Sequence, residues 1–241
     1  MSHQRLDKII ASQGKYSRSD VRKLVRGGKV SVNGNFVTDS SVKVDPNTDK
    51  ITVLGESLGY SEFVYIMMNK PEGVVSASRS PKEKTVVDLV PDELKRDGLF
   101  PAGRLDKDTT GFVLITDDGA FAHEILAPKK HVEKTYVAEL DRPIGDGELE
   151  KFRSGVVLAD GYECLPAEIK LLSSDGLNVE IKLREGKYHQ IKRMAAACGS
   201  HVNKLHRTAM GELELDGSLS QGECRLLTTQ ELAKIKMYVL K

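Results

Sequence analysis

The stretch GRLDKDTTGFVLITDDG, residues 103–119, holds the side chains in this sequence that are best placed for chemistry. Asp106 sits in a short turn-like segment beside Arg104, and the apolar, β-branched run at 112–116 predicts a buried strand. A carboxylate just ahead of a buried strand is held by a rigid element, as a reacting group requires. The same residues also allow a structural interpretation, in which Asp106 caps a turn or pairs with Arg104 across it.

A second stretch, EGKYHQIKRM at residues 185–194, concentrates cations where a helix is expected to begin. A strand is predicted to end at Gly186, and a helix to begin near His189 and continue to Gly199. A helix start with cations beside it is a natural phosphate site. Residues 184–207 hold six Lys or Arg, one acidic residue and three His. Taken alone, this region could also be an ordinary basic surface helix.

Several strands are expected to position these two stretches. An apolar run predicts one strand at 63–68, which the turn-forming residues 69–73 are expected to end. Another strand is expected at 136–140. Alternation of apolar and polar residues predicts half-buried strands at 167–172 and 177–183.

The first thirty residues are strongly basic, with eight Lys or Arg against two Asp, whereas the rest of the chain sums to −5. Leu6, Ile9 and Ile10 follow one face of a helix, a second helix is expected after Ser17, and an Asn-Gly pair at 33–34 predicts a hairpin. Cations concentrated on two short helices favour phosphate contact over a merely solvated surface. The expected contacts are Arg5, Lys8, Arg18, Arg22, Lys23 and Arg26.

Bulk properties limit the remaining function classes. The chain of 241 residues suits a small domain followed by a larger one, and its net charge of +1 is uninformative by itself. The three cysteines are far apart and show neither a disulfide framework nor zinc-ligand spacing. Without an apolar run of membrane-spanning length or a signal-peptide pattern, we expect a cytoplasmic protein with reduced thiols and no membrane association.

Four features occur together in this sequence: GRLD-x-x-T-x-G, the K-x-Y of residues 134–136, the EGKYHQIKRM run and the basic head. The head resembles the S4 RNA-binding module over roughly residues 3–50. The combination resembles the RsuA/RluB family of bacterial ribosomal RNA pseudouridine synthases over essentially the whole chain. One departure is Lys192, where many relatives have Arg.

The resemblance implies an α+β architecture in two domains. A small α/β S4-like RNA-binding domain is expected at residues 1–58 and a catalytic domain at 62–241, with a linker between them. The catalytic domain is expected to contain a mixed, largely antiparallel sheet flanked by helices.

The resemblance also implies a reaction that uses neither a cofactor nor a metal. The C1′–N1 bond of a uridine breaks, the base turns, and it rejoins the ribose through C5. Asp106 is implied as the essential carboxylate, either attacking C1′ or promoting elimination. The remaining implied residues are Tyr136, Lys192 and Arg193 for catalysis, and Arg104, Lys134, Leu183, His189 and Gln190 for substrate binding. The sequence leaves open which of Lys192 and Arg193 partners the carboxylate.

The expected substrate is one uridine, of the uridine-516 type, in 16S ribosomal RNA within a partly assembled small subunit, bound by a monomer. Within the same family, a 23S ribosomal RNA target is the alternative. From different classes, a non-catalytic S4-containing RNA-binding or ribosome assembly factor stays open. So does a nucleoside hydrolase that uses Asp108 as a second carboxylate.

Overall fold

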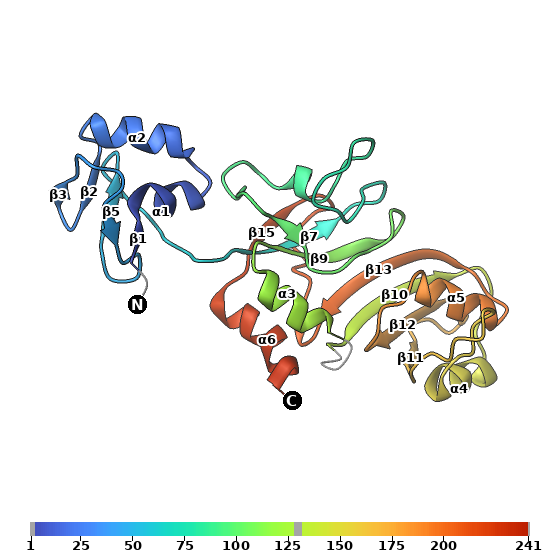
Figure 1. Ribbon diagram of the computed structural model, residues 1–241. Coiled ribbons are helices and arrows are strands. Elements are labelled where there is room, and N and C mark those ends of the chain that lie inside the picture. Colours follow the sequence, from blue (N-terminus) through green and yellow to red (C-terminus); the bar gives the residue numbers. More distant parts are fainter. Residues whose placement is uncertain (1–2, 128–131, 241) are drawn as a thin grey trace. The chain divides into compact units, whose positions relative to one another are not determined.

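The computed structural model describes residues 3–127 and 132–240 (Figure 1), and its contacts divide the chain into two compact units. Unit 1 comprises the residues up to Val64 together with 90–99, and unit 2 comprises 65–89 and the chain from Phe100 onward. Within the described ranges, no helix is both long enough and apolar enough to span a bilayer.

Unit 1 packs two helices, α1 (Leu6–Ser12) and α2 (Arg18–Arg26), with short strands. Its four-stranded antiparallel sheet has the order β3-β2-β5-β6. The strands are β1 (Gln4–Arg5), β2 (Val30–Val32), β3 (Asn35–Phe36), β4 (Lys43–Val44), β5 (Ile51–Val53) and β6 (Glu56–Ser57), with β1 pairing β4. The predicted helices and the Asn-Gly hairpin between β2 and β3 are confirmed.

The predicted apolar face of α1 forms the core of unit 1, because Leu6, Ile9 and Ile10 are all at most 1% exposed. Helix α2 begins with a capping box, in which the Ser17 hydroxyl accepts from the amide of Asp20 and the Asp20 carboxylate accepts from the amide of Ser17. Such a cap satisfies amides that the first helical turn leaves free.

Unit 2 is built on a mixed sheet whose described strands follow the path β11-β12-β10-β13-β9-β7-β15, with β14 beside β13 and β8 beside β9. Of the described strand pairs, β9 with β13 is parallel and the others are antiparallel. The expected α+β class is therefore confirmed. The strands are β7 (Tyr65–Lys70), β8 (Phe100–Pro101), β9 (Thr110–Thr116), β10 (Lys134–Leu140), β11 (Glu168–Leu171), β12 (Asn178–Leu183), β13 (Val202–Met210), β14 (Leu213–Glu214) and β15 (Cys224–Leu226).

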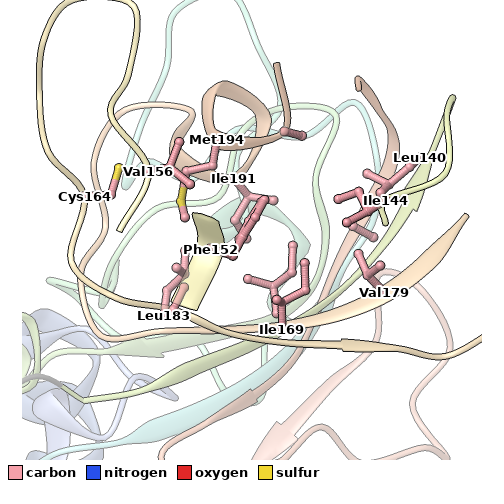
Figure 2. Packing of buried hydrophobic residues seen from close by; sticks show 14 of the residues in the cluster. Leu140, Ile144, Phe152, Val156, Cys164, Ile169, Val179, Leu183, Ile191 and Met194 are labelled. Atoms are coloured by element: carbon pink, nitrogen blue, oxygen red, sulfur yellow. The ribbon is translucent and has the colours of Figure 1, made fainter. Parts of the chain in front are cut away.

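Helices cover opposite faces of this sheet. On one face, α4 (Asp146–Ser154) and α5 (Gln190–Ala197) pack over β10, β11 and β12. Figure 2 shows Phe152 of α4 and Ile191 and Met194 of α5 meeting Val179 and Leu183 of β12. On the other face, α3 (Gly119–Leu126) and α6 (Thr229–Leu240) pack over β7 and β9 (Figure 1).

Two sequence-predicted strand ends are wrong. Strand β7 continues through Asn69 and Lys70, which were predicted to form a turn, because the buried ammonium of Lys70 finds three backbone carbonyls to bind. Strand β12 ends at Leu183, as the alternation at 177–183 predicted, and does not continue to Gly186. Beyond that end, the carboxylate of Glu185 accepts from the Tyr162 hydroxyl and the Leu165 amide, which lie outside the strand ladder.

Candidate active site

A cavity of about 80 Å³ in unit 2 brings together most of the side chains that the sequence marked for chemistry. Asp106, His189 and Lys192 also line an adjoining open hollow of about 380 Å³. The cavity lining includes Arg104, Asp106, Tyr136, Leu183, His189, Gln190 and Lys192. Four elements therefore converge: the loop before β9, strand β10, strand β12 and the start of α5.

Asp106 is a partly exposed carboxylate between two potential cations. The Nζ of Lys192 lies 3.5 Å from one carboxylate oxygen, and the Nε2 of His189 lies 3.4 Å from the other. Among the residues that the structure describes, these two side chains, and not Arg104, are the ion-pair partners of Asp106. The side chain is 29% exposed, so a substrate atom can reach it.

Lys192 is shared between two carboxylates. Its Nζ donates to Asp108 at 2.6 Å, a shorter contact than the one with Asp106. The hydrogen bond from Lys192 holds the pKa of Asp108 below its ordinary value. Asp108 therefore stays ionised and fixes the ammonium beside Asp106.

Buried polar side chains hold the loop that carries Asp106. The Ser76 hydroxyl donates to the carbonyl of Leu105 and accepts from its amide. Lys70, which is 0% exposed, donates to the carbonyls of Lys107 and Thr109 on the far side of Asp106. The backbone around the carboxylate is thus fixed before any substrate binds.

Gly111 is required where β9 meets β13. Its φ is +100°, and a Cβ there would lie 2.3 Å from the carbonyl oxygen of Arg207. Any side chain would push the two parallel strands apart and shift the loop that precedes β9. This close approach explains the glycine that follows Thr110 in the sequence stretch.

Tyr136 and Leu183 supply an apolar surface inside the cavity. Leu183 lies opposite Lys134 in the ladder of β10 and β12, which makes it a diagonal neighbour of Tyr136 on the same face. Leu183 is 3% exposed, and Tyr136 packs against the same core cluster. A planar base entering the cavity would meet an aromatic ring and an aliphatic side chain.

The turn ahead of α5 is tightly braced. His189 has φ +49°, a left-handed conformation that is uncommon for a residue with a side chain. Gln190 accepts from the amide of Lys187 and donates to the carboxylate of Glu185. Because Gln190 is only 4% exposed, its amide mainly holds this turn in shape.

The structure places two sequence-predicted residues outside the cavity lining. Arg193 pairs with Asp160 at 2.5 Å, while Lys192 faces Asp106. Lys134 donates to the carbonyl of Val132 at 2.8 Å, and burial lowers its pKa to about 8. Of the two adjacent cations, the geometry therefore associates Lys192 with the carboxylate.

Sequence reasoning missed Lys70 and Ser76. Burial lowers the pKa of Lys70 to about 8, which shows how unusual its environment is for a lysine. The one available signal was a lysine at the end of an apolar run, directly before Pro71. Nothing in the local pattern marked Ser76.

The predicted phosphate-binding side chains of unit 1 all lie at the surface. Arg5 donates two hydrogen bonds to the buried carboxylate of Asp7, which lowers the pKa of Asp7. Arg22 also approaches Asp7, at 3.9 Å. The exposed residues are Arg5, Lys8, Arg18, Arg22, Lys23 and Arg26.

A larger cavity, of about 840 Å³, opens on the other face of the unit 2 sheet. It is lined by Thr135 and Lys182, whose neighbours Tyr136 and Leu183 face the smaller cavity, since successive strand residues point to opposite faces. Its several carboxylates, among them Glu133 and Glu180, would repel a polyanion. Within the described residues, no group of His, Cys, Asp or Glu is arranged to hold a metal ion.

Comparison with known proteins finds two families in the chain. Residues 64–197 match the model of the RNA pseudouridylate synthase family, and residues 4–49 match the S4 domain. A solved structure described as a pseudouridylate synthase is 38% identical, with a TM-score of 0.67, and the match covers 96% of this chain and 99% of that one.

Two curated relatives match along nearly their whole length. The Bacillus subtilis protein named "uncharacterized RNA pseudouridine synthase YtzG" is 46% identical, over 95% of this chain and 96% of its own. "Ribosomal small subunit pseudouridine synthase A" of Escherichia coli is 40% identical, over 96% and 99% respectively. With the family model matching more than half of its length, this chain belongs to the RNA pseudouridylate synthase family and is a pseudouridine synthase with an S4 domain.

Proposed function

We propose that this enzyme isomerises one uridine of small-subunit 16S ribosomal RNA, at a site of the uridine-516 type, with Asp106 as its reacting carboxylate. One observation carries the proposal. Asp106 lies between His189 and Lys192 at a cavity whose lining also includes the ring of Tyr136 and the aliphatic side chain of Leu183. Cations beside a carboxylate stabilise its negative charge, and Tyr136 and Leu183 offer a nucleobase an apolar surface.

The reaction begins with extrusion of the target uridine from its stack, at a cost of a few kcal/mol. Leu183 and the ring of Tyr136 receive the base. Asp106 then acts on the ribose, and the C1′–N1 bond breaks. Attack on C1′ and elimination across the ribose both start from this carboxylate.

To complete the isomerisation, one proton must leave C5 of the base and one must be added to N1. After the base turns, the C1′–C5 bond forms, and we assign the transfer of the C5 proton to the Tyr136 hydroxyl. When Asp106 is released from the ribose, Lys192 and His189 stabilise its negative charge. No atom is gained or lost overall, so the step is an isomerisation.

The hydrolase alternative is not supported by the position of Asp108. That carboxylate accepts a hydrogen bond from Lys192 at 2.6 Å, which accounts for its presence without a role in activating a water. We assign Asp108 to positioning Lys192 instead.

The two parts of the chain have separate roles in this proposal. Residues 1–58 grip phosphates through their exposed cations, and residues 62–241 carry out the isomerisation. We further propose that the enzyme works as a cytoplasmic monomer on a partly assembled small subunit, where phosphate contacts select which uridine reaches Asp106.

The choice of 16S RNA rests on the Escherichia coli relative, whose name specifies the small subunit. The test is to map pseudouridines in the small-subunit and the large-subunit ribosomal RNA from cells with and without this gene. Loss of one small-subunit pseudouridine is the expected result. Loss of a large-subunit pseudouridine, with the small-subunit pattern unchanged, would refute the 16S assignment but leave the role of Asp106 standing.

A further inference from the structure

An aromatic ring lies exposed at the rim of the active-site cavity. Tyr188 is 76% exposed, although its neighbours Lys187 and His189 both line the cavity. Single exposed aromatic residues are common on protein surfaces and need no special explanation. What distinguishes Tyr188 is the residue on which its ring rests.

The ring of Tyr188 stacks on the ring of His189, with centroids 3.8 Å apart and planes inclined by 19°. His189 in turn lies 3.4 Å from Asp106. Side chains of successive residues normally diverge, and the left-handed backbone at His189, with φ +49°, lets these two rings lie together. The two stacked rings therefore extend from the Asp106 carboxylate to the solvent-exposed surface.

An exposed aromatic ring beside the active site is useful to an enzyme that binds RNA with one base unstacked. When the target uridine leaves its stack and enters the cavity, the adjacent nucleotide loses a stacking partner. Single-stranded RNA segments are held by aromatic side chains on which unstacked bases rest. One face of the Tyr188 ring is occupied by His189, and the high exposure leaves the remaining ring surface open to a base.

We propose that Tyr188 is a positioning residue that stacks on the nucleotide next to the target uridine. This inference rests on the active site proposed above. Stacking uses the π face that every base has, so Tyr188 recognises an unstacked segment beside the target rather than one base type. Stacking also fixes the distance of the flanking nucleotide from Asp106, because His189 contacts both the ring and the carboxylate.

The test compares Tyr188→Ala with Tyr188→Phe, which keeps the ring. A matched control is Leu172→Ala, an apolar side chain of the same unit that is 46% exposed and lies outside both hollows of the active site. The substrate is the ribosomal RNA in which the modified uridine has been mapped, taken from cells that lack the gene. Tyr188→Ala should raise KM by about 5- to 150-fold, with kcat little changed, as expected for the loss of one stacked base.

Direct evidence of stacking comes from fluorescence. The probe is a synthetic segment of that RNA with 2-aminopurine on either side of the target uridine. Binding to wild type or to Tyr188→Phe should quench the 2-aminopurine fluorescence, and binding to Tyr188→Ala should not. An active wild type with an unchanged Tyr188→Ala variant would overturn the stacking role alone. Equal damage from Phe and Ala, or damage confined to kcat, would also overturn it. A wild type that is inactive on both ribosomal RNAs, and also on partly assembled small subunits from the same cells, would overturn the proposed function and the stacking role together.

Discussion

At the scale of single residues, one cation next to Asp106 distinguishes this site from an ordinary basic surface. Lys192 lies 3.5 Å from Asp106, while Arg193 is engaged by Asp160. We predict that Lys192→Met lowers kcat by about 100-fold or more, because a fixed charge beside the reacting group is lost. Arg193→Met should lower kcat by less than about 10-fold. Steady-state kinetics on ribosomal RNA would measure both, and a reversed order would contradict the assignment.

The sequence predicted that a cation near residue 192 acts at the site, and it could not choose between neighbours. Consecutive residues on a helix point about 100° apart, so the choice depends on the rotation of α5 about its axis. That rotation is set by the burial of Ile191 and Met194 against the strands, which is a tertiary effect.

Lys134 offers a residue-scale prediction with a definite pH dependence. Burial lowers its pKa from 10.5 to about 8, so the unfolded chain binds more protons than the folded one between those values. The charged amine therefore destabilises the fold fully below about pH 8, and this penalty fades as the pH rises toward 10.5.

Lys134→Met should be more stable than wild type near neutral pH by about 1–3 kcal/mol. The advantage should shrink as the pH rises from about 8 to 10.5. Urea unfolding across this range measures the difference in the free energy of unfolding, and the exposed Lys170→Met serves as the control. A difference that is independent of pH would contradict the burial explanation.

At the scale of elements, the site depends on how the loop before β9 is held. Ser76 is 6% exposed and makes both of its hydrogen bonds to the backbone of Leu105. Ser76→Ala should lower the free energy of unfolding by about 1–2 kcal/mol. It should also lower kcat by about 10- to 100-fold, because the neighbouring carboxylate loses its fixed position.

The matched control for Ser76→Ala is Ser154→Ala on α4. The Ser154 hydroxyl also bonds a backbone carbonyl, that of Glu150, but it is exposed on the helix surface. We expect little change in stability or rate from the control. Equal effects of the two substitutions would show that Ser76 does not position Asp106.

Element types could largely be read from the sequence, since strand β9, the α1 face and the α2 cap followed their patterns. The exceptions arise from long-range contacts. Lys70 lies in a segment whose residue types predict a turn, yet its ammonium donates hydrogen bonds to carbonyls up to 39 residues away. Likewise, residues 90–99 group with unit 1 although they lie between two segments of unit 2 in the sequence. Local pattern carries no information about such partners.

At the scale of the whole molecule, the proposal assigns RNA affinity and chemistry to different parts of the chain. Replacing Arg18, Arg22 and Arg26 by Gln should weaken RNA binding and flatten its salt dependence. Each lost phosphate contact should reduce the slope of log K against log salt by about 0.7 to 0.9. Lys234→Gln, an exposed change on α6, is the control. An unchanged slope in the triple variant would show that these cations do not contact RNA.

The most direct test of the account is Asp106→Asn, because it removes one charge while preserving the shape of the side chain. The measurement combines single-turnover isomerisation of the mapped ribosomal RNA with the affinity of the same RNA. We predict that isomerisation is abolished and that affinity stays nearly intact, because the proposed function assigns RNA binding to many cations and the reaction to one carboxylate. Residual isomerisation within about tenfold of wild type would contradict the assignment of Asp106 as the reacting group.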